Sequence, residues 1–177
     1  MLGAHLHLAE LYLRARTKLA EDWPGRTESL LKRVLELSPP CRRALFLLGS
    51  LYADPLVSRP GDAEIIFSKL EDNADACLFM AQTKIAKGDV APAPTEALEW
   101  LCRHIALASS FSSRASELVA LLLPRNLEVQ QWNRLAELLQ ALEPEVSDSE
   151  MVRISETRRS IDHRSASKLS ALGAGTA

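Results

Sequence analysis

The feature that most constrains this chain is a short residue pattern that returns four times. Each copy has an alanine, a bulky apolar residue four positions later, a small residue directly after it, and usually a leucine two positions further on. Positions i, i+4 and i+7 lie on one face of an α-helix, and a small residue at i+5 lets a neighbouring helix approach closely. The pattern therefore predicts helices that pack in antiparallel pairs. The four copies are Ala4-Leu8-Ala9-Leu11, Ala44-Leu48-Gly49-Leu51, Ala76-Met80-Ala81-Thr83 and Ala115-Val119-Ala120-Leu122.

A second pattern alternates with the first. Between successive copies lie segments in which a proline precedes an acidic residue and then apolar residues, and aligning Thr27, Ala63 and Ala97 gives spacings of 36 and 34 residues. Proline suits the first turn of a helix because its missing N–H is not needed there, and acidic residues near a helix start complement the helix dipole. The two series together predict a right-handed α-solenoid of about four helical hairpins.

Composition supports an all-α fold. The 177 residues include 31 Leu and 24 Ala but only 7 Val and 6 Ile. Leucine and alanine propagate helices, whereas strands need more β-branched and aromatic residues than this. Proline and glycine mark most of the breaks between helices. The predicted helices are 3–20, 25–37, 41–53, 61–71, 74–87, 94–109, 112–123 and 127–142.

The C-terminal region differs from the rest. Residues 1–142 form the expected repeat domain, and residues 143–177 form a polar C-terminal tail. One short amphipathic helix is expected at 150–163, because its few apolar residues recur at helical spacing. From Ser165 onward the chain is mainly Ser, Ala and Gly. Little apolar surface is left to offset chain entropy there, so we expect the rest of the tail to be disordered.

Charge and hydropathy argue against several classes of protein. Lys and Arg number 21 against 23 Asp and Glu, and the net charge is −2. Without a long basic run, nucleic acid is not an expected partner. No apolar run reaches the roughly 20 residues that a membrane-spanning helix needs. Residues 1–13 lack the basic start of a secretory signal.

The cysteines and the first histidines form no metal motif. The three cysteines are 36 and 25 residues apart, which matches no zinc or redox spacing. We expect small buried or half-buried thiols at Cys41, Cys77 and Cys102. His5 and His7 are two residues apart, so on a helix they point in different directions and cannot share a metal. The sequence therefore predicts no metal and no cofactor.

Catalytic motifs are also missing from the sequence. The serine-rich segment 109–113 lacks a nucleophile-elbow glycine pattern, and Ser112 or Ser113 is expected to cap the following helix. None of the seven glycines forms a phosphate-binding motif. One enzymatic alternative is kept open, a small helical hydrolase that uses His104 with a serine or a glutamate.

The best-preserved copy resembles the Sel-like repeat, a relative of the tetratricopeptide repeat with a loop of variable length between its helices. The resemblance rests on Ala-x3-Leu-Gly-x-Leu-Tyr at 44–52, the loop 53–60 and the helix 96–101, and it extends over residues 4–142. The usual second glycine is missing from the first two copies, and Lys84 replaces an expected aromatic residue. The resemblance implies a solenoid that binds proteins.

A narrower resemblance is to the bacterial lipoproteins that act as scaffolds for alginate export. It is carried by Leu-Leu-Gly-Ser-Leu-Tyr at 47–52, Asp-Ala at 75–76, Arg-Ala-Ser-Glu-Leu at 114–118 and Pro124. It implies a C-terminal portion of such a protein, placed in the periplasm at the outer membrane within an exopolysaccharide secretion complex. The lipid-bearing cysteine of those proteins has no counterpart here. Without this resemblance, the expected compartment is the cytoplasm.

The expected function is a non-enzymatic interaction scaffold or adaptor. Solenoids expose a long concave surface made by the first helix of each hairpin, and such surfaces bind peptides, helices or domains. A secretion chaperone or assembly factor that binds one client segment would share the same fold. Polar residues on the first helices are the predicted partner-binding positions: His7, Glu10, Ser50, Gln82 and Lys84.

Overall fold

The computed structural model describes residues 2–15, 22–86, 93–108, 110–125, 127–143 and 146–174. Over these residues the chain is all-α, with helices joined by turns and no strand. The chain divides into two compact units, Met1–Glu71 and Asp72–Ala177. The fold class predicted from the composition is therefore correct at the level of an all-α protein.

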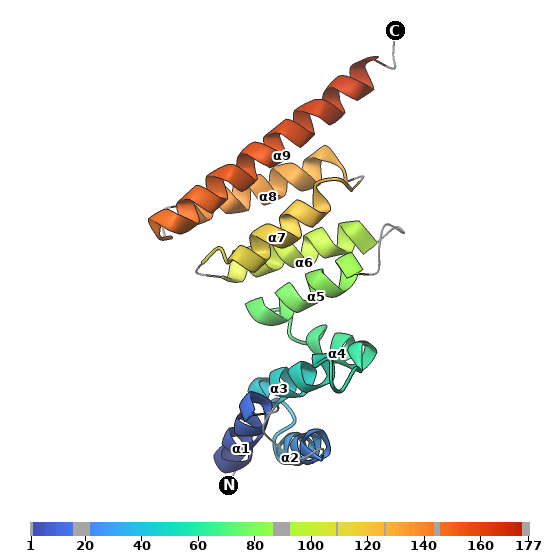
Figure 1. Cartoon of the computed structure of the whole chain (residues 1–177), viewed down its shortest axis with the longest axis vertical. Helices are drawn as coiled ribbons and strands as arrows, with labels where there is room; N and C mark the ends of the chain where they lie inside the picture. Colours follow the sequence, from blue (N-terminus) through green and yellow to red (C-terminus); the bar gives the residue numbers. More distant parts are fainter. Residues whose placement is uncertain are drawn as a thin grey trace. The chain divides into compact units, whose positions relative to one another are not determined.

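The first unit is built from the helices α1 (Leu2–Ala15), α2 (Trp23–Leu37), α3 (Arg42–Ala53) and α4 (Pro60–Phe67). α1 packs on α2 and α3, α2 packs on α3, and α3 packs on α4 (Figure 1). Prolines lie in the first turns of α2 and α4, as predicted. α4 is shorter than the predicted 61–71, because the backbone after Phe67 tightens into turns. In these turns Lys69 N donates to Ile66 O at 3.1 Å and Leu70 N donates to Phe67 O at 2.9 Å.

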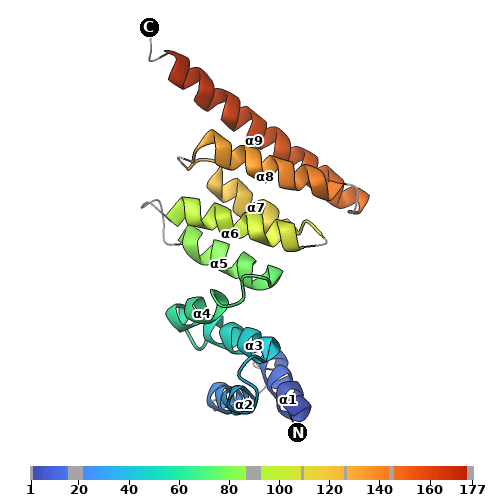
Figure 2. The same cartoon turned by 180° about the vertical axis from the view of Figure 1, so that it is seen from behind.

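The second unit is built from α5 (Ala74–Ala86), α6 (Ala93–Leu107), α7 (Ser113–Leu122), α8 (Val129–Leu142) and α9 (Asp148–Ala174). Most of these helices pack on the next one along the chain, and the same stacking is visible from behind in Figure 2. In addition, α5 packs on α7, α7 packs on α9, and α6 packs on α8. The unit therefore has two layers, with α5, α7 and α9 in one and α6 and α8 in the other.

Both residue series found in the sequence supply core positions. The aligned residues of the second series are all 0% exposed: Thr27, Ala63 and Ala97. In the first series, the small residues Gly49 on α3 and Ala81 on α5 are buried, whereas Ala120 on α7 is exposed. The pattern thus marks packing faces best in its second and third copies. The last copy keeps every position but Ala120 in the core, whereas in the first copy only Ala9 is buried.

The helix α9 differs most from the sequence-based expectation. A helix at 150–163 followed by disorder is predicted, but α9 extends from Asp148 to Ala174. Its buried residues recur every three or four positions, and two isoleucines among them belong to the hydrophobic core of the unit. A helix with weak intrinsic preference is stabilised when its packing partner is already in place. The buried residues of α9 are Ile154, Thr157, Ile161 and Ser165.

The boundary between the units also differs from the predicted boundary between a repeat domain, 1–142, and a tail, 143–177. The units meet between Glu71 and Asp72. Because α9 packs on α7 and α8, the predicted tail is the closing helix of the second unit. Of the predicted helices, parts of 3–20, 74–87 and 94–109 lie outside the described residues.

Gly49 marks a close approach of α4 to α3. A Cβ atom at this position would lie 2.8 Å from Cε1 of Phe67 and 2.9 Å from its Cζ. Phe67 is 2% exposed, and its ring packs against Phe46 with 5.8 Å between the ring centroids. A side chain at position 49 would therefore force this buried ring to shift, which favours glycine there.

We expect Gly49→Ala to destabilise the first unit by about 1 kcal/mol, because overpacking costs about 1–3 kcal/mol and the gain in helix propensity is about 1 kcal/mol. Gly25→Ala is the matched control, since no atom lies within 4 Å of a Cβ added there. The control should gain about 0.5–1 kcal/mol. Urea unfolding followed by the indole NMR signal of Trp23 measures both. Equal stabilisation by the two substitutions would contradict the contact with Phe67.

Candidate functional site

Basic side chains of α9 donate hydrogen bonds to the loops at both ends of α7. Arg153 donates from Nη2 to the carbonyl of Phe111 at 3.3 Å, and Lys168 donates from Nζ to the carbonyl of Leu127 at 2.6 Å. Both carbonyls lie in loops just before a helix start, where a basic side chain can supply the hydrogen-bond donor. These contacts fix α9 beside α7 along most of its described length.

The start of α7 is capped as the sequence predicts. The Oγ atom of Ser112 accepts a hydrogen bond from the backbone N–H of Ala115 at 3.1 Å. Ser116, one turn into α7, shares a hydrogen bond of 3.3 Å with Thr157 on α9. The two helices are therefore joined by a polar contact between side chains as well as by the apolar core.

An open groove of about 590 Å³ lies between the C-terminal end of α7 and the middle of α9. Two apolar residues follow α7 there, and four polar or basic residues come from α9. The groove is lined by Leu123, Pro124, Arg159, Ser160, His163 and Arg164. A smaller hollow continues it along the two helices, because both are lined by Leu123 and Ser160. We call these two together the α7–α9 groove.

The rim of the α7–α9 groove is basic. Arg159 and His163 are exposed and four residues apart, so they lie on one face of α9. Among the described residues, no carboxylate pairs with either side chain. Arg164 is half-buried and donates to the carbonyl of Pro124 at 3.5 Å. Among the described residues, the lining of the larger hollow therefore presents positive charge with no paired carboxylate, whereas the smaller hollow also contains Glu156.

The five predicted partner-binding residues belong to both units. They divide between the units, with His7, Glu10 and Ser50 in the first and Gln82 and Lys84 in the second. None of the five is in the hydrophobic core, and His7 and Gln82 are exposed to solvent.

Four of these residues are engaged within the chain, since Nδ1 of His7 lies 3.6 Å from Oε2 of Glu10. Glu10 accepts a hydrogen bond from Nε of Arg43 at 2.7 Å, and Lys84 pairs with Glu96 at 2.8 Å. Ser50 donates its hydroxyl to a backbone carbonyl of its own helix at 2.9 Å. Gln82, which is exposed, and His7, whose side chain is 72% exposed despite its contact with Glu10, are the better placed of the five to meet a partner.

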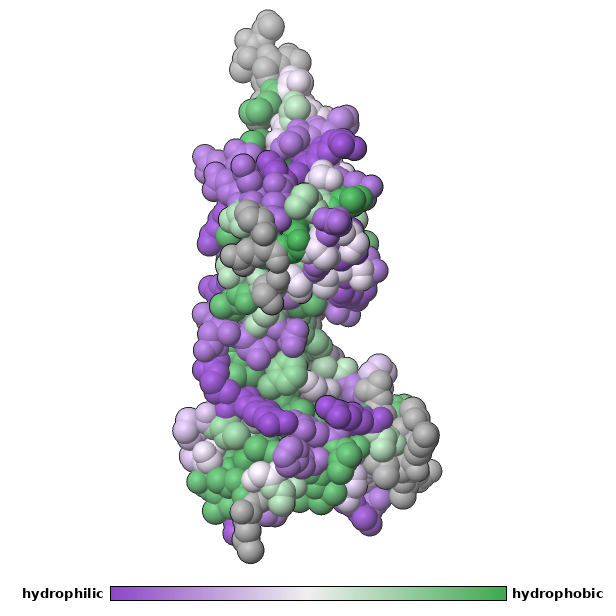
Figure 3. All heavy atoms as spheres, turned by 90° about the vertical axis from the view of Figure 1, so that its left-hand side faces the viewer, coloured by the Kyte–Doolittle hydropathy of each residue, from purple (hydrophilic) through white to green (hydrophobic). Residues whose placement is uncertain are grey.

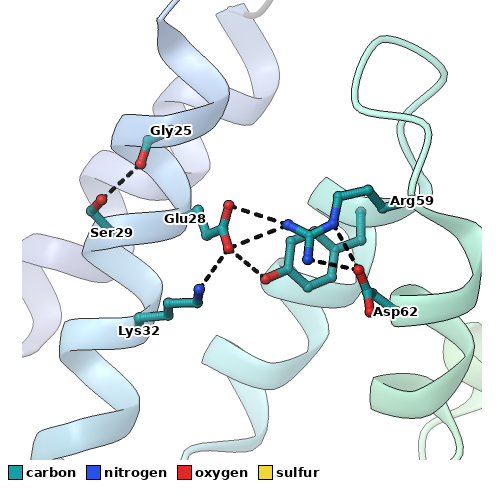
Figure 4. Close-up of polar contacts among 7 residues, drawn as sticks. Gly25, Glu28, Ser29, Lys32, Arg59 and Asp62 are labelled. Carbon is teal, nitrogen blue, oxygen red and sulfur yellow. Dashed lines mark hydrogen bonds and ion pairs between the residues drawn. The ribbon is translucent and has the colours of Figure 1, made fainter.

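A polar cluster in the first unit joins α2, α3 and the start of α4 (Figure 4). Glu28 accepts a hydrogen bond from the Tyr52 hydroxyl at 2.8 Å and pairs with Lys32 at 2.7 Å. The guanidinium of Arg59 lies 4.2 Å from the centroid of the Tyr52 ring and pairs with Asp62 at 2.6 Å. Each charged group of the cluster faces an opposite charge. The cluster therefore stabilises the unit, and it leaves no unpaired group for a ligand.

The cluster changes the acidity of its members. The hydrogen bond from Lys32 holds the pKa of the Glu28 carboxyl below its ordinary value of 4.5. Burial, assisted by the contact with Glu28, raises the pKa of the Tyr52 hydroxyl. Both shifts favour the protonation states that make the hydrogen bond between the two side chains.

The lowered pKa of Glu28 predicts that the first unit loses stability in acid. The folded-state pKa lies below the unfolded-state value, so ionised Glu28 stabilises the unit above about pH 4.5 and this contribution is lost as the pH falls further. Glu28→Gln should lower the free energy of unfolding by about 1 kcal/mol at neutral pH and flatten its pH dependence between about pH 5 and 3.

Urea unfolding at several pH values, followed by the Trp23 indole signal, measures the effect. Glu36→Gln on the same helix is the control, because the Glu36 side chain is 62% exposed and pairs only with Arg33 among the described residues. A pH dependence that is the same in wild type and Glu28→Gln would show that Glu28 does not couple folding to pH.

The thiols are placed as predicted. Cys77 and Cys102 are buried, and Cys41 is half-buried. Burial raises the pKa of the Cys102 thiol to about 11, which keeps it protonated at neutral pH. Over the described residues, no three His, Cys, Asp or Glu side chains are grouped so that they can hold a metal ion.

His104, the residue of the hydrolase alternative, lies in the packing between α5 and α6. It is 5% exposed, and its Nδ1 atom is 2.8 Å from the carbonyl oxygen of Ala74. A carbonyl only accepts, so Nδ1 carries the proton. Nε2 is buried and has no hydrogen-bond partner in the part of the chain that the structure describes. The imidazole therefore bonds to the backbone and not to a serine or a glutamate.

The surfaces of the two units differ in hydropathy (Figure 3). The part of the second unit at the height of α8 and α9 is largely hydrophilic, whereas the first unit shows a broad hydrophobic area. Exposed leucines of α1 are Leu2, Leu8 and Leu11. Leu8 also lines an open groove between α1 and α2. That groove carries no unpaired charge to indicate its occupant, so the α7–α9 groove is the more informative candidate site.

Comparison with known proteins does not assign the chain to a family, since no protein-family model, no curated protein and no solved structure matches it. The resemblances to the Sel-like repeat and to the alginate-export scaffolds therefore rest on the sequence motifs. Within the described ranges, every helix is too short or too polar to cross a bilayer.

No motif in the sequence predicts the α7–α9 groove. The spacing of Arg159 and His163 indicates that both residues lie on one helical face. The sequence nevertheless predicts that this segment belongs to a polar tail. Leu123 and Pro124 mark the end of a predicted helix, and Pro124 also belongs to the motif similar to the alginate-export scaffolds, but neither residue predicts a groove. The groove arises when α9 folds back against α7, which no local pattern specifies.

Proposed function

We propose that this chain is a non-enzymatic interaction module that binds protein segments on the layer formed by α5, α7 and α9 of its second unit. The arrangement of helices in the second unit is the main support for this proposal. In the second unit α5, α7 and α9 pack in one layer, and an open groove with an apolar floor and a basic rim lies between α7 and α9. Such a groove suits an extended or helical segment, whereas small-molecule sites enclose most of their ligand.

A right-handed α-solenoid of Sel-like or tetratricopeptide-like hairpins is the architecture we propose for this module. Within each unit, helices pack on neighbours one and two positions along the chain, as stacked hairpins do. Aligned small residues on α2, α4 and α6 are fully buried, which supports a common packing register. The resemblance of residues 44–52 to the Sel-like repeat favours the same architecture.

The particular role that the narrower resemblance favours is assembly of a bacterial exopolysaccharide secretion complex of the alginate type. The chain would then act in the periplasm at the outer membrane; otherwise we propose the cytoplasm. A secretion chaperone or assembly factor is the second candidate, because one groove of this size suits a single client segment. Both roles use the same surface and differ in the partner.

Site-specific photo-crosslinking in the source cells tests the proposed function. A benzophenone amino acid is placed at Gln82 on α5 and at Arg159 on α9, and in matched controls at Glu99 on α6 and Glu137 on α8. All four positions are exposed. We expect protein adducts from the first two positions at several times the yield from the controls, because only the layer of α5, α7 and α9 binds partners.

The identity of the adducts separates the two candidate roles. Components of an envelope polysaccharide-export complex would support the scaffold, and a single client protein would support the chaperone. Equal yields from all four positions, or no adduct from Gln82 and Arg159, would contradict an interaction surface on this layer.

A further inference from the structure

The floor of the α7–α9 groove is apolar and offers no free hydrogen-bond donor. Leu123 is half-buried and packs against the hydrophobic core of the unit, so it is held in place. Pro124 has no backbone N–H, and its carbonyl already accepts from Arg164 at 3.5 Å. A ligand gains from this floor only by burying apolar surface on it.

The wall formed by α9 carries positive charge above this floor. Arg159 is exposed and has no carboxylate partner among the described residues, while the adjacent Arg158 points to another contact and pairs with Glu143 at 2.6 Å. Two acidic residues of α9 are three positions from Arg159: Asp162 lines neither hollow, and Glu156 lines only the smaller one, away from Pro124 and Arg164. The basic groups facing the groove thus remain available to an anionic partner.

The combination of floor and rim selects among anionic ligands. A nucleic acid needs a long basic surface that follows its phosphates, but this groove has two arginines and the whole chain has a net charge of −2. A bare phosphate makes no use of an apolar floor. A peptide with carboxylates on either side of an apolar side chain is complementary to both the apolar floor and the basic rim. Arginine pairs with carboxylates through two parallel hydrogen bonds.

We propose that the α7–α9 groove binds an acidic peptide segment of another protein, in which carboxylates flank an apolar residue. The apolar side chain rests on Leu123 and Pro124, and the carboxylates pair with Arg159 and Arg164. Pairing with Arg164 competes with its long contact to the Pro124 carbonyl, which is near the limit for a hydrogen bond. This inference rests on the proposed function and adds to it the chemistry of the partner.

Fluorescence anisotropy with the full chain tests the inference. Three fluorescein-labelled peptides of twelve residues are compared: one built from Glu and Leu, one with every Glu replaced by Gln, and one with every Leu replaced by Ser. We expect the Glu/Leu peptide to bind at least about tenfold more tightly than either of the others, and its affinity to fall as salt is raised.

Three variants locate the binding on the chain. Arg159→Glu reverses the charge of the rim, and Ser160→Trp fills the groove without changing charge; both should weaken binding of the Glu/Leu peptide by about tenfold. Arg134→Glu is the matched control, since Arg134 is exposed on α8 and makes the same change in net charge outside the groove. The control should alter the affinity less than about twofold. Circular dichroism checks that each variant is folded.

Several results would overturn the inference. Equal weakening by Arg159→Glu and Arg134→Glu would indicate diffuse attraction to the whole chain. Equal binding of the Glu/Leu and Glu/Ser peptides, or stronger displacement by inorganic polyphosphate or a short RNA, would assign the groove to anions without an apolar part. If all three peptides fail while crosslinks from Gln82 and Arg159 persist, the acidic-segment inference is wrong and the proposed function stands.

Discussion

The packing of one face of α9 against α7 and α8 is the contact on which the second unit depends. Ile154 and Ile161 lie in the same hydrophobic core as Trp132, Leu135 and Leu139 of α8. Burying an isoleucine side chain contributes roughly 1.5–3 kcal/mol, so the two isoleucines supply a large part of what holds a sparsely apolar helix in place. The same contact makes α9 one wall of the α7–α9 groove. Without it, the chain would have neither the closed core nor the candidate site.

The second residue series also places one polar side chain at a position that is apolar in its other copies. Seven residues after the aligned positions Thr27 and Ala63 stand Val34 and Leu70, both buried. The equivalent residue after Ala97 is His104, which is buried because its Nδ1–H donates to a carbonyl at 2.8 Å. A histidine at this place is therefore a variant of an apolar packing position.

The sequence predicts the parts of the fold that are encoded by local patterns. Up to α8, the helix bounds that fall within the described residues lie within a few residues of the predicted ones, since the apolar residues recur at helical spacing and proline marks several starts. The helix α9 could not be predicted in full, because its C-terminal half is rich in serine and alanine and is ordered by packing on distant residues. The sequence also could not predict the partners of two candidate residues: Glu10 accepts a hydrogen bond from Arg43, and Lys84 pairs with Glu96.

The candidate site likewise combines features that local sequence patterns predict with features that arise only when the chain folds. The idea of an interaction surface on alternate helices comes from the repeat pattern, and His7 and Gln82 remain exposed on such helices. The groove itself combines the end of α7 with the middle of α9, which are about 40 residues apart in the chain. Its charge comes from Arg159 and its neighbours, and its floor comes from Leu123 and Pro124. Only the folded chain brings these together.

Hydrogen exchange of the backbone amides in the intact chain, resolved along the sequence, tests this account most directly. If α9 completes the core of the second unit, the amides of residues 154–168 will exchange as slowly as those of α7 and α8, because all three helices open together. Exchange of these amides at the rate of an unstructured peptide, while α7 and α8 remain protected, would contradict the packing of α9 and with it the groove.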